Sequence, residues 1–287
     1  MKKLRIKSII SIICFSVGLA IFIYLFFMPY AYVVNFKTSQ SPISVYSFVH
    51  ENTLDIYENE KGIYFTQILK NEDTQLHWRV ESGNKGSDVQ IKIVFNESNL
   101  KEKIRILTFR SSLLEKILKR IKKMYKSMSD DFKSFSWTTP LNDKLPEIDC
   151  LCIQLDSKIR EKPKFMNQNV DLLAYHAQNQ SKLPPKLYIN DIDFINQKFS
   201  YEFCFPIGKS GVYKPLPEKF YIKKQIVSTS HSIDFYGNFA ATQRFWAKLY
   251  DSLRLENDKI SYPVVEEFLD SPFSGKDDKE WKSKLYF

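Results

Sequence analysis

The N-terminal region constrains this chain most, because it contains a long run that water solvates poorly. Residues 9–34 hold no acidic or basic side chain. The run exceeds the roughly 20 apolar residues that cross the hydrocarbon core of a bilayer. Tyr24, Tyr30 and Tyr32 stand toward its end, where interfacial aromatic side chains are typical. The sequence therefore predicts a cytoplasmic tip and a transmembrane helix over residues 1–34, with the lipid bilayer as partner through residues 9–34.

The charges beside this run predict its orientation. Lysine or arginine stands at positions 2, 3, 5 and 7, and the next basic residue is Lys37. An excess of basic residues before a span favours an N-terminus inside the cell. The soluble domains then lie outside the cytoplasm, in the periplasm of a Gram-negative cell. The alternative is a cleaved signal peptide, but the apolar run is long for one and the segment around Ala31 lacks a good small-x-small site. We expect a retained single-pass anchor in the cell membrane.

The amino-acid composition limits the classes of function that the chain can have. The hydrophobic and aromatic fractions of 44% and 15% suit folded domains. Only 8 glycines are present, and neither GxGxxG nor GxxxxGK[ST] occurs, which argues against a glycine-rich nucleotide loop. The formal net charge is +9, and the basic residues are interleaved with acidic ones along the chain, which favours a solvated surface. No helix-turn-helix segment precedes the C-terminal domain, and we expect no nucleic-acid partner.

Residues 35–135 are expected to form a first α+β domain. Alternation and turn residues predict strands at 33–37, 62–69, 75–81, 88–95 and 104–109, and a short helix at 45–51. Apolar residues from Leu113 to Met128 recur at helical spacing and predict a helix of about 20 residues. Ser112 and Glu115 are its predicted capping box. The lysines on this helix either face water or contact anionic lipid.

The opening sequence VNFKTSQSPISVYSFVHE resembles the first strand and helix of the START-like (SRPBCC, polyketide-cyclase-like) helix-grip family. The resemblance extends over roughly residues 32–132. It implies an antiparallel sheet gripped by the long helix.

The remaining sequence is expected to form a linker, residues 136–147, and a second domain, residues 148–287. Strands are predicted at 148–155, 187–189, 199–205, 220–230, 231–236, 264–269 and 281–287, with helices at 165–178 and 239–253. The segments FSYEFCFPI and EWKSKLYF each close one half in the same way. Two similar halves predict a duplicated strand-helix-strand-strand domain with a cleft between the repeats, and an α+β fold for the whole chain.

Three segments of the second domain, IDFYGNFAATQRFWAKLYDSL, PVVEEFLDSP and EWKSKLYF, are similar in order and spacing to the GyrI-like family. That family includes the effector-binding domains of AraC-type regulators. The resemblance implies a cleft that binds small molecules. In many members a glutamate on the last strand faces the ligand and favours cations. Lys284 stands at that position here, which favours a neutral or anionic ligand.

Candidate ligand-binding residues are aromatic and polar side chains drawn from both halves. They are Tyr201, Phe203, Phe205, Tyr213, Tyr236, Trp246, Glu266, Trp281 and Lys284. Aromatic rings can stack on a planar guest, and one or two charges can orient it. The alternative is that the aromatic residues are core and the charges are exposed strand positions. The predicted partner is a small hydrophobic or aromatic molecule.

Signatures of catalysis and of metal binding are absent from the sequence. None of the 4 histidines makes an HxxxH or HxH pair, and no GxSxG occurs. Cys150-x-Cys152 lacks a second ligand pair for zinc. We expect these cysteines and Cys204 in the core, with a bridge from Cys150 or Cys152 to Cys204 as the alternative. No catalytic residue, metal or cofactor is predicted.

The sequence therefore favours a membrane-anchored protein that senses or sequesters a small molecule. Two alternatives stay open. One is a small-molecule hydrolase that uses Glu266, or its neighbour Glu267, as its base, and the other is a structural or interaction module that binds no ligand.

Overall fold

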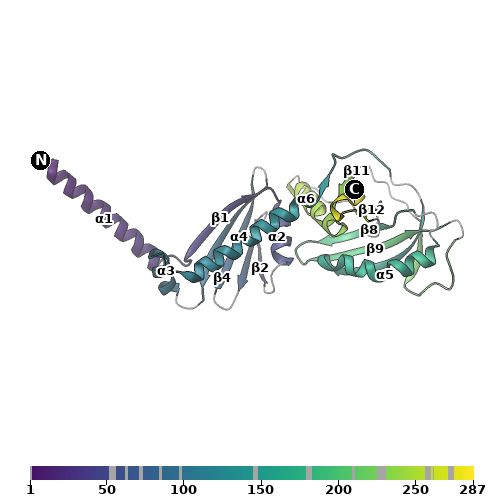
Figure 1. Ribbon diagram of the computed structural model, residues 1–287, viewed down its shortest axis with the longest axis horizontal. Coiled ribbons are helices and arrows are strands. Elements are labelled where there is room, and N and C mark those ends of the chain that lie inside the picture. The colour runs from purple at the N-terminus through teal and green to yellow at the C-terminus, as the bar shows by residue number, and fades with distance from the viewer. Residues whose placement is uncertain are drawn as a thin grey trace. The chain divides into compact units, whose positions relative to one another are not determined.

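The computed structural model is α+β, with two antiparallel sheets and helices (Figure 1). It describes residues 2–51, 56–61, 64–70, 74–83, 86–96, 99–144, 148–178, 183–208, 211–224, 231–255, 260, 262–270 and 275–287. The contacts divide the chain into two compact units. Unit 1 comprises Met1–Pro42 and Asn52–Ser127, and unit 2 comprises Ile43–Glu51 and Met128–Phe287.

Unit 1 begins with the apolar helix α1 (Lys2–Phe26). The helix was predicted to extend to residue 34. This end is wrong, because Tyr32–Thr38 forms strand β1, which pairs with β5. Pro29 lacks a backbone N–H and cannot continue a helix, while the β-branched Val33 and Val34 fit a strand. The helix therefore ends several residues before the apolar run does.

The sheet of unit 1 has five strands in the order β1-β5-β4-β3-β2. The remaining strands are β2 (Ile56–Lys61), β3 (Tyr64–Lys70), β4 (Thr74–Gly83) and β5 (Gly86–Phe95). The strands predicted at 33–37, 62–69, 75–81 and 88–95 correspond to β1, β3, β4 and β5, while β2 was not predicted. Val89, Ile91 and Ile93 are buried on alternate positions of β5, which matches the period of a half-buried strand.

Two helices follow this sheet. The strand predicted at 104–109 is wrong, because Asn99–Leu107 forms helix α3. The predicted long helix is confirmed as α4 (Ser112–Phe132). Its capping residue is Ser111 rather than Ser112, since the Ser111 Oγ accepts the Leu114 N–H at 3.1 Å.

Helix α2 (Pro42–Glu51) belongs by its contacts to unit 2, although its sequence lies within the predicted first domain. The backbone N–H of Ile43 donates to Asp251 at 2.9 Å, and the Tyr46 hydroxyl donates to the carbonyl of Ile195 at 3.0 Å. Ile43, Val45 and Val49 are almost completely buried. An apolar sequence predicts that a helix is buried, but it does not say which unit buries it.

The sheet of unit 2 has eight strands in the order β10-β7-β9-β8-β12-β13-β11-β6. They are β6 (Ser136–Trp137), β7 (Asp149–Lys158), β8 (Lys186–Asp193), β9 (Lys198–Pro206), β10 (Phe220–Lys224), β11 (Ser232–Tyr236), β12 (Val264–Phe268) and β13 (Lys282–Tyr286). Residues 136–137 were predicted in a linker, but they form an edge strand paired with β11. The Trp137 ring packs against Phe135 and Phe245, which holds this segment on the unit.

Unit 2 is built from two strand-helix-strand-strand repeats. The first is β7, α5 (Lys162–Ala177), β8 and β9, and the second is β11, α6 (Thr242–Leu255), β12 and β13. The neighbours β7-β9-β8 mirror β11-β13-β12, and the two repeats meet where β8 pairs with β12. The strand predicted at 220–230 does not open the second repeat. Its described part is β10, which pairs with β7 at the sheet edge, and residues 225–230 lie outside the described residues.

Side chains alternate between two faces of this sheet. We call the side that carries α5 and α6 the helix face, and the other side the opposite face. Tyr201, Phe203 and Glu266 point to the helix face by register and alternation. On the opposite face a disulfide joins Cys152 to Cys204, which are directly paired across β7 and β9. Both faces are buried near the junction of the repeats.

Candidate functional site

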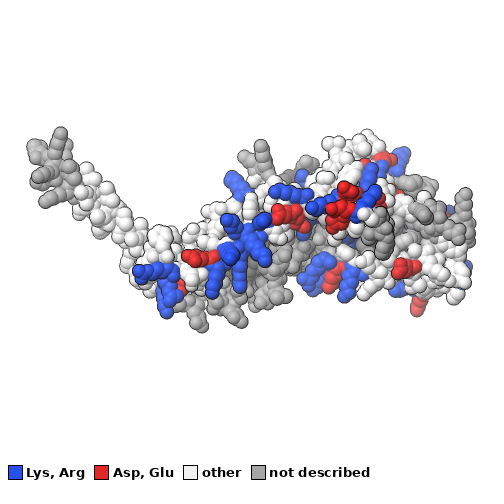
Figure 2. All heavy atoms as spheres, viewed as in Figure 1, with Lys and Arg blue, Asp and Glu red and all other residues white. Residues whose placement is uncertain are grey.

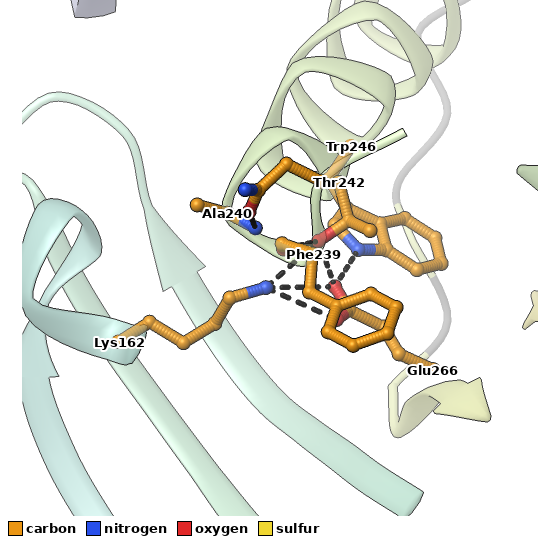
Figure 3. Close-up of polar contacts among 7 residues, drawn as sticks. Lys162, Phe239, Ala240, Thr242, Trp246 and Glu266 are labelled. Carbon is orange, nitrogen blue, oxygen red and sulfur yellow. Dashed lines mark hydrogen bonds and ion pairs between the residues drawn. The ribbon is translucent and has the colours of Figure 1, made fainter. Parts of the chain in front are cut away.

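A buried carboxylate lies at the junction of the two repeats. Glu266 stands in the middle of β12, whose five residues are all buried. Its Oε1 accepts the Trp246 Nε1–H at 2.7 Å and the Thr242 hydroxyl at 2.8 Å. The Lys162 Nζ lies 3.0 Å from its Oε2 (Figure 3). Groups from both repeats therefore bind one carboxylate, and we call these four residues the Glu266 network.

Local structure places these donors. Lys162 is the first residue of α5, and Thr242 is the first residue of α6. Each follows a short 3-10 turn, η1 (Ile159–Glu161) or η2 (Phe239–Ala241). The two residues thus hold equivalent positions in the two repeats, and the Lys162 Nζ donates to the Thr242 Oγ1 at 2.7 Å.

Burial makes the Glu266 network energetically sensitive. The side chains of Lys162 and Glu266 are 2% and 0% exposed. Removing a charge from water costs several kcal/mol, and only good geometry with additional hydrogen bonds offsets that cost. The Trp246 and Thr242 donors supply those bonds. The Lys162 ammonium also lies 5.7 Å from the centre of the Phe199 ring, within range of a cation–π contact.

A second ion pair lies on the opposite face. Glu267 follows Glu266 on β12 and therefore points the other way. Its Oε1 lies 3.2 Å from the Nζ of Lys186, its direct partner across β8 and β12. The Tyr286 hydroxyl donates to the Glu267 Oε2 at 3.1 Å. Burial is the main cause that raises the pKa of Tyr286, so this phenol stays a donor at neutral pH.

The structure divides the nine predicted residues among three places. Tyr201, Phe203, Phe205, Trp246 and Glu266 are buried on the helix face or on α6, and Trp281 is half-buried against Phe239, with ring centres 5.0 Å apart. Tyr236 and Lys284 point to the opposite face by register. Tyr213 is exposed in a loop and contacts the Tyr175 ring. Within the first group, Trp246 donates a hydrogen bond to Glu266 at the junction of the repeats.

Lys284 is not a free charge. Its Nζ is hydrogen-bonded and ion-paired with Asp143. This hydrogen bond holds the pKa of the Asp143 carboxyl below its usual value. The ion pair weakens the argument that Lys284 attracts an anionic guest.

Sequence reasoning missed Lys162, Thr242 and Lys186 as partners of the two carboxylates Glu266 and Glu267. The signal available was the segment VVEEF, in which two adjacent carboxylates interrupt an apolar strand. Buried carboxylates need partners, so this segment predicts two basic or hydrogen-bonding residues from elsewhere. The sequence alone does not identify them.

Among the described residues, the cysteines of unit 2 do not form a metal site. Cys152, Glu202 and Cys204 bring one ligand atom each within 4.8 Å of one another, but the two sulfurs are joined to each other. Cys150 is free and buried, and burial raises the pKa of its thiol to about 11. It is therefore a protonated, unreactive thiol at neutral pH.

A described hollow lies in unit 1, and none of the nine predicted residues lines it. It is open to solvent and has a volume of about 500 Å³. Most of its lining residues are polar, and they come from β1, β4 and β5: Asn35, Phe36, Lys37, Arg79, Glu81, Asp88, Val89 and Gln90.

No protein-family model matches this chain, and no curated protein matches it. Similar solved structures include the C-terminal domain of EcmrR, at 10% identity and a TM-score of 0.42, covering 52% of this chain and 95% of that one. SAV2435 bound to tetraphenylphosphonium has 11% identity and a TM-score of 0.33, with 52% and 92% covered. An uncharacterized conserved protein from Listeria innocua has 12% identity and a TM-score of 0.33, with 52% and 90% covered. Likenesses of this degree do not assign the chain to a family.

Proposed function

We propose that α1 anchors the chain in a membrane and that unit 2, outside the cytoplasm, binds a small, neutral aromatic molecule on its helix face. The anchor rests on Ile9–Phe26, whose 18 residues have a mean hydropathy of 2.7 and are not buried by the rest of the protein. The Cys152–Cys204 disulfide supports the location, because disulfides persist in oxidising compartments and are rare in the cytosol.

The observation that carries the binding proposal is the convergence of both repeats on Glu266 beside half-exposed aromatic rings. Phe239 lies close to the Glu266 network (Figure 3). Its ring centre is 4.8 Å from that of Phe268 and 5.0 Å from that of Trp281. Aromatic walls with a few convergent polar groups are typical of small-molecule sites. The guest stacks on Phe239 and Trp281, above the polar centre.

The charge of the guest follows from the pairing of the local charges. Lys162 neutralises Glu266 on the helix face. A cationic guest would have to displace that ammonium, and an anionic guest would meet the carboxylate. A neutral planar molecule avoids both costs.

The hydrolase alternative has no support in this geometry. A general base must reach the proton that it removes. Glu266 is completely buried, and both of its oxygens already accept hydrogen bonds. The non-binding interaction module remains the second candidate, and the complete burial of Tyr201, Phe203 and Trp246 favours it, because these rings already fill the interior.

A ligand screen tests binding. The full chain in detergent is heated with neutral, cationic and anionic planar aromatic compounds, because a ligand that binds the native state raises the melting temperature. We expect neutral compounds to stabilise it and Phe239→Ala or Trp281→Ala to abolish the shift. Tyr213→Ala is the matched control, since Tyr213 is exposed in a loop. The module candidate gains if no compound shifts the transition, or if both variants keep the shift.

Fusion proteins test the topology. Alkaline phosphatase joined after Phe36 is expected to be active, because the enzyme requires an oxidising compartment. A cytoplasmic reporter at the same position is the control. An inactive phosphatase with an active cytoplasmic reporter would reverse the proposed location.

A further inference from the structure

Helix α3 has its polar and apolar sides reversed relative to a helix of a soluble protein. Leu100, Ile104 and Leu107 share one side at helical spacing, and they are 42%, 47% and 42% exposed. Glu102 and Lys103, by contrast, are only 5% and 2% exposed. A water-facing helix normally buries its apolar stripe. This arrangement indicates that the outer side of α3 meets something apolar.

The buried charges of α3 join it to the end of α1. The Lys103 Nζ donates to the carbonyls of Tyr24 at 3.1 Å and Leu25 at 3.2 Å, and also to that of Met28. These are carbonyls that the end of a helix leaves without partners, and a cation is favourable there. The Asn99 Nδ2 donates to the carbonyl of Pro29 at 3.2 Å. Helix α3 is therefore held at the level where the proposed span ends.

Phe109 extends the apolar side of α3. The Arg110 N–H donates to the carbonyl of Arg105 at 2.8 Å, and the Phe109 N–H donates to that of Ile106 at 3.0 Å. This is the C-terminal motif in which glycine usually takes the left-handed position. Phe109 occupies it with a φ of 55° and is 94% exposed. A bulky ring in this strained conformation, without burial in the protein, points to a contact outside the chain.

Basic side chains flank this apolar surface. Lys101, Arg105 and Arg110 are exposed, and Figure 2 shows basic residues gathered over α3 and along α4. Apolar residues beside lysine and arginine are typical of helices that lie in the membrane interface, where the basic side chains reach anionic head groups.

We propose that α3 and Phe109 form a second membrane contact, an inference that rests on the proposed membrane span of α1. Leu100, Ile104, Leu107 and Phe109 insert into the boundary between head groups and acyl chains of the leaflet where α1 ends. Lys101 and Arg110 lie at the anionic head groups. This contact fixes the depth and orientation of unit 1 at the bilayer surface, which a single flexible anchor does not.

Depth-dependent quenching tests this contact on the full chain. A Cys14→Ser background is reconstituted in vesicles of phosphatidylcholine and phosphatidylglycerol, and the fluorophore bimane is attached to Phe109→Cys or Ile104→Cys. Lipids with a nitroxide at the shallow carbon-5 position should lower the emission at both sites at least about two-fold, since interfacial helices insert roughly 5–10 Å. Lys37→Cys, whose native side chain is 86% exposed at the end of β1, is the soluble control and should change little.

Leu19→Cys, within the span, separates the two proposals. Quenching at position 19 by a deep nitroxide, without shallow quenching at 104 and 109, overturns the second contact and leaves the anchor intact. No quenching at position 19 overturns the anchor itself. Shielding of position 109 from aqueous iodide without any lipid quenching indicates a protein contact, such as a second copy, and also overturns the lipid proposal.

Discussion

Two adjacent residues of β12, Glu266 and Glu267, meet contrasting environments on the two faces of one sheet. Glu266 is bound by side chains of both repeats and is 0% exposed, while Glu267 is bound by residues of its neighbouring strands and is 8% exposed. The helix-face pair therefore joins the two repeats through α5 and α6. The opposite-face pair also crosses the junction of the repeats, but it does so directly between the paired strands β8 and β12.

The largest decrease in the free energy of unfolding is expected from Lys162→Met. The substitution keeps most of the side-chain volume but leaves the Glu266 carboxylate buried without a cation. Breaking a buried ion pair in this way costs about 3–5 kcal/mol. Urea unfolding of the full chain in detergent measures the loss. A loss below about 1 kcal/mol would show that water or another group compensates Glu266.

Loss of the Cys152–Cys204 disulfide is expected to cause the next largest decrease in the free energy of unfolding. The bridge closes a segment with a sequence separation of 52, and bridges of this kind typically contribute about 2–4 kcal/mol. Cys204→Ser should lower the urea midpoint of unit 2, and added reductant should have no further effect on that variant. Equal stability of the oxidised and reduced protein would contradict the expectation.

Lys186→Met should cost less unfolding free energy than Lys162→Met, about 1–3 kcal/mol, because Glu267 is 8% exposed and lies nearer to water than the fully buried Glu266. The same urea titration measures it. A larger loss than that of Lys162→Met would contradict the expectation that the helix-face pair stabilises the fold more than the opposite-face pair.

The smallest effect is expected from Asp143→Asn, which removes the ion pair with Lys284. Lys284 lowers the folded-state pKa of Asp143, so the stability from this pair is present above the unfolded pKa and is lost as the pH falls below about 4. A partly exposed pair contributes at most about 1 kcal/mol. The melting temperatures of wild type and variant should therefore differ slightly at pH 7 and converge near pH 2. A constant difference would exclude a titrating contribution.

The sequence predicted the elements whose periodicity was consistent over many residues. The stripe from Leu113 to Met128 became α4, and the two repeats of unit 2 were recognisable from their alternating strands. Helix α3 was mistaken for a strand because apolar residues cluster at 104, 106, 107 and 109. Three of them, Ile104, Leu107 and Phe109, are exposed, so the cluster does not form the buried stripe that usually identifies a helix.

The candidate site was predictable only in part. Glu266 and Trp246 were identified and are bonded to each other. Lys162 was not, because a lysine at the start of a helix is normally solvated. Its burial depends on the packing of one repeat on the other, which local sequence does not encode. Tyr236 and Lys284 were grouped with the other candidate ligand-binding residues, although they point to the opposite face. Alternation gives the relative faces within one strand, but not which face two strands share.

A double-mutant cycle tests the asymmetry of the two faces most directly. The unfolding free energies of Lys162→Met, Glu266→Gln and the double variant give the coupling between these residues, and Lys186→Met with Glu267→Gln gives the matched value for the opposite face. We predict a coupling above about 2 kcal/mol for the first pair and a clearly smaller one for the second, within the range of directly contacting residues. Equal couplings, or none between Lys162 and Glu266, would contradict the conclusion that the helix-face ion pair contributes more than the opposite-face pair to holding the two repeats together.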